Sequence, residues 1–215
     1  MNLKAYITDV LPGEGVTMFA PFADTYLVEK RQITEAEVRL DDGRTISADQ
    51  RKKIYATLRD VSTYTGHTTE YLKDFFKAEY VAETGGDWFS LSDVDMTTAN
   101  IFLELLIEHC IRWDIPCQGN VIERSPDVSR YLYACLCHKK CALCGSKAEL
   151  HHVDAVGAGR NRKEILHLGM RALPLCRNHH IEIHNIGRDT FCEKYHVYGI
   201  KLDEELCGIW KLKAA

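Results

Sequence analysis

The residues of this chain that could do chemistry are cysteines and histidines gathered between positions 141 and 184. They form a Cys-x2-Cys pair, a tandem histidine pair and a Cys-x2-His-His-x3-His run. Thiolates and imidazole nitrogens at such spacings are typical ligands of zinc and other transition metals. The spacing separates into two groups, which predicts two metal sites of different kinds.

Four of these residues have the paired spacing of a closed tetrahedral zinc site. Cys141 and Cys144 flank a tight turn, so both thiolates can point at one ion. Cys176 and His179 repeat the same separation at the expected start of a helix. Because four protein ligands leave no open position for a substrate, we expect this site to hold a structural Zn²⁺.

The remaining cysteines leave an alternative open. Cys137 lies four residues before Cys141, beside Cys135 and His138, and could enter a different ligand set. We prefer the pair that closes on Gly145. The thiols farther from the cluster are expected to be buried or free, namely Cys110, Cys117, Cys192 and Cys207.

Three histidines of the second group can meet at an open metal site. His180 and His184 are four residues apart, so on a helix their imidazoles project from the same face. His151 ends a predicted strand and can supply a third nitrogen. His152 points to the other side of that strand by alternation, so we expect it to stay unligated and to act as a base.

The segments that carry these histidines resemble the ββα-metal core of the HNH endonucleases. They are Glu149-Leu-His-His-Val-Asp154 and, 26 residues further on, His180-Ile-Glu-Ile-His184. The likeness to the core of the colicin DNases is close, and the chain is also similar to a group of phage HNH nucleases in which a zinc knuckle is common. The resemblance covers residues 140–187.

The resemblance implies a role for each histidine. It assigns His151, His180 and His184 to a catalytic Mg²⁺, Mn²⁺, Ni²⁺ or Zn²⁺, and it makes His152 the general base. Such a cation offsets the charge that develops on the phosphate during hydrolysis, while a neutral imidazole takes a proton from the attacking water. The implied products carry 5′-phosphate and 3′-hydroxyl ends.

The chain departs from the family motif where an asparagine usually precedes the second strand. Counting back from His180 places Arg171 there. The family asparagine is thought to brace the loop that bears the base, so Asn161 or His167 could replace it from the intervening loop. Arg171 could reach a phosphate, or it could be an ordinary exposed loop residue.

The loop between the two predicted strands is rich in glycine and in cations. Its candidates for holding the DNA backbone are Arg160, Arg162 and Lys163, which follow a Gly-Ala-Gly turn. Glycines let a loop approach a strand closely, and the cations neutralise phosphates. Ordinary solvated surface is the alternative.

The N-terminal half resembles the NinB (Orf) family of phage recombination mediators. The likeness lies in residues 47–62, which match the opening helix of that family, and in the predicted helix over 97–114. It implies a homodimer that binds single-stranded DNA, or the single-strand-binding protein or recombinase on it. Its natural DNA contacts are Arg51, Lys52 and Lys53, although such a run is often a solvated helix face.

Hydrophobic periodicity and turn residues predict an α+β fold that positions these groups. Strands are expected over 3–10 and 16–22, and an extended or mixed segment over 26–40. Three helices follow, over 50–64, from Thr68 or Thr69, and from Met96 or Thr97, the last with Ile101, Leu105, Leu106 and Cys110 or Ile111 inward. The C-terminal half should contain a helix over 127–137, a strand ending at His152, a strand over 172–175 and a helix over 178–185.

Length and charge predict two domains within the 215 residues. We place a mixed α/β domain at 1–117, a linker at 118–126 and a zinc-stabilised ββα-metal domain, resembling a treble clef, at 127–215. Residues 1–125 contain 13 Lys and Arg against 21 Asp and Glu, whereas residues 126–215 contain 14 against 10. A basic half suits a polyanionic substrate, and the acidic half argues against a broad DNA-binding surface there.

Neither an export signal nor a membrane span is visible, so we expect a soluble protein of the cytoplasm, or of the host cytoplasm if a phage encodes it. The resulting prediction is an HNH DNA endonuclease of a phage or prophage recombination or replication system. The alternative is a noncatalytic single-stranded-DNA-binding mediator with a degenerate HNH zinc domain. The retained His152 beside three ligand histidines favours the enzyme.

Overall fold

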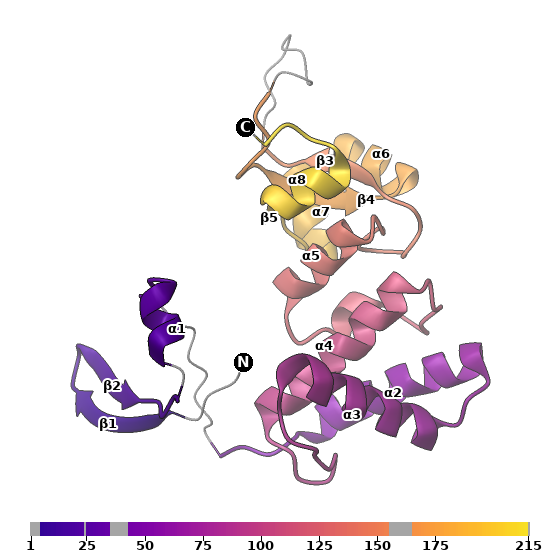
Figure 1. Ribbon diagram of the computed structural model, residues 1–215. Helices are drawn as coiled ribbons and strands as arrows, with labels where there is room; N and C mark the ends of the chain where they lie inside the picture. Colours follow the sequence, from indigo (N-terminus) through magenta and orange to yellow (C-terminus); the bar gives the residue numbers. More distant parts are fainter. Residues whose placement is uncertain (1–4, 24, 35–42, 155–164, 215) are drawn as a thin grey trace.

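The computed structural model describes residues 5–23, 25–34, 43–154 and 165–214. Its N-terminal hairpin and a helical unit precede a small sheet flanked by helices (Figure 1). In chain order the elements are β1 (Tyr6–Leu11), β2 (Gly15–Phe19), α1 (Thr25–Lys30), α2 (Ala48–Thr65), α3 (Thr69–Thr84), α4 (Met96–Arg112), η1 (Val121–Glu123), α5 (Val128–Cys137), β3 (Glu149–His152), β4 (Arg171–Leu175), α6 (Arg177–Ile186), α7 (Arg188–Tyr195), β5 (Ile200–Lys201) and α8 (Glu204–Trp210).

Helices α2, α3 and α4 begin where their capping residues predict. Ser47 accepts a hydrogen bond from the Gln50 amide while the Gln50 side chain accepts one from the Ser47 amide, which is a complete capping box. The Thr68 side chain accepts a hydrogen bond from the Tyr71 amide at the start of α3, and the Asp95 side chain accepts one from the Thr98 amide at the start of α4. Gly66 and Gly85 end α2 and α3 in the left-handed conformation that suits glycine. The three helices predicted for this half are therefore confirmed.

The inward face of α4 agrees in part with the predicted one, since Leu106 and Cys110 are buried as expected. Its fully buried side chains are Ala99, Phe102, Leu103, Leu106, Ile107 and Cys110. Ile101 and Leu105, which we expected to face inward, are only partly buried and pack against the edge of the core. The reason is that α4 contacts α2, α3 and α5, so its buried stripe is centred between several neighbours.

The N-terminal strands form an isolated antiparallel hairpin. β1 pairs with β2, and neither lies in the sheet of the C-terminal half. The strand predictions are confirmed with shifted ends. The segment that we expected to be extended or mixed from residue 26 begins with helix α1 over residues 25–30, so this part of it is not extended. The helix ends on Lys30, where a cation complements the helix dipole. The rest of that predicted segment, apart from residues 31–34, lies outside the described residues.

The C-terminal half contains the predicted ββα arrangement. β3 and β4 are antiparallel, with His151 opposite Leu173, and α6 follows β4 directly. β5 adds a third strand to the sheet and was not predicted. Gly199 precedes it because any larger residue would not fit: a Cβ there would lie 2.8 Å from atoms of both Arg171 and Val153. Helices α7 and α8 were also missed.

One hydrophobic core connects the two halves. Its buried side chains run from Ile46 in the N-terminal half to Val197, and they include Leu132 of α5. Figure 1 shows α5 lying between α4 and the small sheet. The helix predicted over 127–137 is thus the element through which the helical unit and the ββα unit pack together. None of the described helices has the length and apolar composition that crossing a bilayer requires.

The segment predicted as a linker is held by a buried ion pair. Arg124 Nη1 lies 2.7 Å from Asp60 Oδ2 on α2, and both side chains are largely buried. The same carboxylate accepts from the Gln118 amide at 3.2 Å, and Arg124 also donates to the Gln118 carbonyl. Ile122 of η1 is 6% exposed. The segment is therefore packed, while the domain boundaries stay a prediction.

Breaking this pair should destabilise the protein strongly. Arg124→Ala leaves the Asp60 carboxylate buried without its cation, and we expect a loss of about 3 kcal/mol in the free energy of unfolding. Arg188→Ala is the matched control, since it removes an arginine from the exposed Arg188–Asp189 pair and should cost less than about 1 kcal/mol. Urea unfolding of both variants measures the difference, and equal losses would contradict the account.

Candidate metal centres

The four residues of the predicted zinc site lie together. The ligand atoms of Cys141, Cys144, Cys176 and His179 all lie within 4.8 Å of one another. Cys144 Sγ is 3.7 Å from Cys176 Sγ, and His179 Nδ1 is 3.2 Å from Cys176 Sγ. Tetrahedral zinc with bonds of about 2.3 Å would set two sulfurs about 3.8 Å apart. The cluster has the dimensions of a closed zinc site.

Local structure explains how the four ligands meet. Cys141 and Cys144 bracket a turn that the Gly145 amide closes on the Cys141 carbonyl at 2.9 Å. Cys176 is the residue before the first turn of α6, and His179 lies in that turn. Burial raises the pKa of the Cys141 thiol to about 12, so its thiolate form requires a nearby cation. This chemistry fits Zn²⁺.

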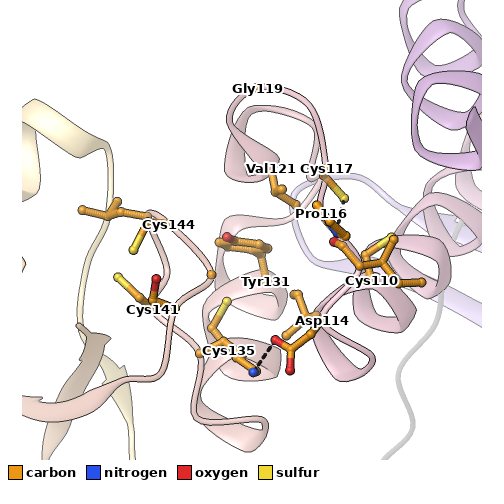
Figure 2. A pocket seen from close by; sticks show the side chains of 16 residues that line it. Cys110, Asp114, Pro116, Cys117, Gly119, Val121, Tyr131, Cys135, Cys141 and Cys144 are labelled. Atoms are coloured by element: carbon orange, nitrogen blue, oxygen red, sulfur yellow. Dashed lines mark hydrogen bonds and ion pairs between the residues drawn. The ribbon is translucent and has the colours of Figure 1, made fainter. Parts of the chain in front are cut away.

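The thiols outside the cluster do not join it. A hollow of about 390 Å³ lies beside the cluster. Figure 2 shows Cys141 and Cys144 on one side of it and Cys110 and Cys117 on the other. Cys135 also lines this hollow, and burial raises the pKa of that thiol to about 12.

Cys137, the alternative ligand, packs against a separate apolar cluster around Leu136 and Leu206, and Cys207 lies within that cluster. The pair that closes on Gly145 is therefore the one that the structure brings to Cys176.

The second cluster contains the three predicted histidines. The ligand nitrogens of His151, His180 and His184 lie within 4.8 Å of one another, and each pair of ring centroids is 5.0 Å apart. His151 is buried, His180 is half-buried and His184 is exposed. The cluster is thus anchored in the fold on one side and open to solvent on the other, as a site that admits a substrate must be.

The electrostatics of the cluster favour neutral imidazole at its buried end. Burial, followed by the proximity of His180, His184 and His152, lowers the pKa of His151 to about 4. An imidazole that stays neutral near pH 7 offers a lone pair to a metal ion. Three imidazoles in contact repel one another when protonated, and a shared cation removes that repulsion. The donor set therefore fits a divalent transition metal.

Glu149 orients one of the three histidines, and the sequence analysis did not predict this contact. Its Oε2 lies 2.8 Å from His180 Nδ1 and 3.5 Å from Arg177 Nη1. A proton on Nδ1 that is donated to this carboxylate leaves the His180 Nε2 lone pair for a metal. The sequence contained the signal, because Glu149 and His151 are two residues apart on β3 and so share one face of the strand.

His152 lies on the opposite face of β3 and meets His167 there. His152 Nε2 is 2.9 Å from His167 Nδ1. His167 is 3% exposed, and its amide donates to the Lys213 carbonyl at 2.9 Å. His152 itself is only half-buried. This placement agrees with the expectation that His152 stands apart from the three ligands. His152 is nevertheless hydrogen-bonded, and its partner, His167, belongs to the loop between β3 and β4.

Arg171 is hydrogen-bonded to Asp154, which follows the end of β3. Its Nε and Nη2 donate to Asp154 Oδ1 at 3.0 and 2.7 Å, and its amide donates to Asp154 Oδ2 at 2.6 Å. The Val153 amide in turn donates to the Arg171 carbonyl at 2.8 Å. These bonds join the two ends of the loop between β3 and β4. Arg171, which we placed at the position of the family asparagine, is thus bonded to a carboxylate at the other end of this loop.

The predicted DNA contacts have different outcomes. Arg160, Arg162 and Lys163, together with Asn161, lie outside the described residues. Lys52 is exposed on α2, and Lys53 pairs with Asp49 at 2.9 Å. The Arg51 side chain is directed at the segment before α4, because its guanidinium donates to the Leu91 and Ser92 carbonyls at 2.8 and 2.9 Å. The three helix cations therefore do not form one open patch.

Comparisons with known proteins agree with this geometry. A sequence model of the family described as "Putative HNHc nuclease" matches residues 20–213, which spans both the helical unit and the ββα unit. Searches of curated proteins and of solved structures gave no match. The HNH resemblance is thereby confirmed, while the likeness to recombination mediators and a phage origin stay predictions. Because the match covers most of its length, the chain belongs to the HNHc nuclease family.

Proposed function

We propose that this protein is a metal-dependent DNA endonuclease that hydrolyses phosphodiester bonds with His152 as the general base. The observation that carries the proposal is the convergence of three histidine nitrogens within 4.8 Å, with His152 on the opposite face of the same strand. We further infer that it serves a phage or prophage recombination or replication system in the host cytoplasm. That inference rests on the sequence resemblance alone.

The residues present support each part of this chemistry. His151, His180 and His184 would hold Mg²⁺, Mn²⁺, Ni²⁺ or Zn²⁺, which when bound stabilises charge on the phosphate and on the departing 3′ oxygen. Glu149 keeps His180 in the tautomer that presents Nε2. The exposed side of His184 leaves room for a DNA strand to enter.

The contact with His167 suits His152 to act as a base. If His152 Nε2 carries its proton and donates it to His167 Nδ1, the lone pair of His152 resides on Nδ1. That nitrogen can take a proton from water as the water oxygen attacks phosphorus. We infer that His167, and the Arg171–Asp154 pair at the neck of the same loop, take over the bracing that an asparagine supplies elsewhere in the family.

The other parts of the chain have supporting roles in the proposal. A structural Zn²⁺ on Cys141, Cys144, Cys176 and His179 would fix the start of α6. The loop cations Arg160, Arg162 and Lys163 would hold the DNA backbone. The N-terminal half would target single-stranded or branched DNA through Arg51, Lys52 and Lys53, or bind a single-strand-binding protein or recombinase, as a homodimer. The alternative, a noncatalytic mediator, keeps these contacts but lacks cleavage.

Plasmid nicking separates the enzyme from the mediator. With Mg²⁺, Mn²⁺ or Ni²⁺ the protein should nick supercoiled DNA, and His152→Ala should lower turnover by about 10²- to 10⁴-fold because water loses its proton acceptor. His67→Ala, an exposed histidine of the helical unit, should cut normally. If the unaltered protein cuts no duplex, single-stranded or branched substrate, the nuclease proposal fails and the mediator remains.

Zinc content and stability test the closed cluster. Cys176→Ser should lose bound Zn²⁺ and lower the melting temperature by about 10 °C or more, since structural zinc binding contributes directly to folding. Cys192→Ser, a half-buried thiol of α7 outside the cluster, should keep its Zn²⁺ and melt within a few degrees of the unaltered protein. Retention of zinc by Cys176→Ser in atomic absorption would disprove this ligand set.

Rescue by a shorter polar side chain tests the bracing of His152. His167→Ala should lower kcat by about 10- to 100-fold with little change in KM, because the base loses its hydrogen-bond partner while the DNA contacts remain. His167→Asn restores an acceptor near the position of Nδ1 and should recover part of that loss. Equal rates for the alanine and asparagine variants would show that His167 only fills space.

A further inference from the structure

A second hollow lies in the helical unit, away from both clusters. It has a volume of about 320 Å³ and is lined by Arg51, Tyr55, Lys73, Lys77, Ser90, Leu91 and Ser92. Three of these seven residues are cations, and no carboxylate is among them. This composition stands out in a half of the chain that contains 13 Lys and Arg against 21 Asp and Glu. The site combines positive charge with the hydroxyl groups of Tyr55, Ser90 and Ser92.

Lys77 is the most unusual member of this site. It is 6% exposed, and its ammonium lies 5.4 Å from the Trp88 ring and 5.5 Å from the Phe89 ring. Within the described part of the chain Nζ has no hydrogen-bond or ion-pair partner. Burial lowers the pKa of Lys77 below its ordinary value. The Asp74 carboxylate offsets part of this shift, and the Lys73 ammonium adds to it. The stem of Lys77 is buried, while its ammonium lines the hollow without an anion, and the phosphate of a ligand can supply one.

Arg51 and Lys73 complete the cationic wall. The guanidinium of Arg51 holds the segment over 90–92 through the Leu91 and Ser92 carbonyls, which places both serines at the rim of the hollow. These carbonyl bonds leave its positive charge uncompensated, as among the described residues it forms no ion pair. Lys73 lies one turn before Lys77 on α3, so the two ammonium groups share one face of that helix.

An aromatic surface adjoins the cations. Trp88 is 58% exposed although it lies against the ammonium of Lys77. An exposed indole beside a cationic hollow is the combination with which proteins bind single-stranded nucleic acid, because unpaired bases stack on the ring while the backbone follows the charges. Paired bases inside a duplex are stacked on one another and cannot use such a ring. The indole therefore favours an unpaired strand over a duplex.

We propose that the hollow over Arg51, Lys73 and Lys77 binds a phosphate of single-stranded nucleic acid, and that Trp88 stacks on the neighbouring base. This inference deepens the proposed function, because it gives the nuclease a strand-binding site remote from its histidines. It differs from the contacts predicted from sequence, since Lys52 and Lys53 do not line the hollow. Arg51 belongs to the site through charge and through its hold on the serine segment.

Fluorescence anisotropy with labelled oligo(dT) tests the proposal. The full chain with His152→Ala and without added divalent cation is the reference, so that cleavage does not interfere. Lys73→Met and Lys77→Met should each weaken binding about tenfold at low salt, and should reduce the slope of log K against log salt by about 0.7 for each phosphate that the variant no longer neutralises. Trp88→Ala should weaken binding by about tenfold and leave that slope unchanged.

Controls separate this site from general charge and from folding. Arg59→Gln removes an exposed cation of α2 that does not line the hollow, and it should bind oligo(dT) like the reference. Lys73 is only half-buried, so Lys73→Met tests the site even if Lys77→Met is unstable. Equal effects of Arg59→Gln and Lys73→Met would overturn the proposal. So would equal affinity for dTMP and oligo(dT), which would mark a mononucleotide pocket.

The same variants distinguish this inference from the nuclease proposal. On a background that retains His152, Arg59→Gln should nick duplex plasmid as the unaltered protein does, because Arg59 lines neither the hollow nor the histidine cluster. Binding of oligo(dT) that depends on Lys73 and Trp88 in a protein without cleavage would support the strand site and refute the nuclease. Cleavage without such binding would refute the strand site and leave the nuclease intact.

Discussion

The orientation of α6 is the constraint on which the two clusters depend. Residues that are adjacent on a helix project about 100° apart, so His179 and His180 cannot point into the same site. His179 belongs to the cysteine cluster and His180 to the histidine cluster. Once Cys176 and His179 meet Cys141 and Cys144, the rotation of α6 about its axis is fixed. His180 and His184, one turn apart, then face His151 on β3. A zinc ion in the closed cluster would therefore determine the geometry of the open one, although it has no part in the chemistry.

The antiparallel pairing of β3 with β4 supplies the other half of this geometry. Alternation along β3 gives Glu149 and His151 one face and His152 the other. The first face meets α6, where Glu149 also binds His180; the second meets His167. A shift of one residue in the pairing would exchange the faces and place His152 among the ligands. The Arg171–Asp154 bonds and the contact of Gly199 with Arg171 and Val153 both act at this strand end. They hold the register where an error would be most damaging.

Sequence reasoning succeeded where short spacing decides the structure and failed where distant segments meet. Separations of three or four residues within a turn or a helix made the pairs Cys141 with Cys144 and His180 with His184 predictable. That His151 meets His180 and His184 was expected from the HNH resemblance. The helix starts at Ser47, Thr68 and Asp127 follow from local capping. By contrast, the burial of Arg124 against Asp60 joins segments whose proximity was not predictable from spacing. His167 was named as one of two candidates for the bracing, but its direct bond to His152 was not predicted. α1 was not predicted, because residues 25–30 include the strand-forming side chains of Tyr26 and Val28.

The charge of the N-terminal half shows why net charge is a poor guide to a binding site. The excess of acidic residues there argued against DNA binding. A net charge, however, counts a carboxylate on the far side of the helices equally with Lys77, whatever its distance from the hollow. At physiological salt exposed charges are screened over about 8 Å, so a phosphate in the hollow responds chiefly to the groups that line it. Those are Arg51, Lys73 and Lys77, with Asp74 as the carboxylate whose field reaches Lys77. Acidic surroundings would also repel a strand that lies elsewhere on this half. A cationic hollow within an acidic half of the chain can therefore direct a nucleic-acid strand more selectively than a uniformly basic surface.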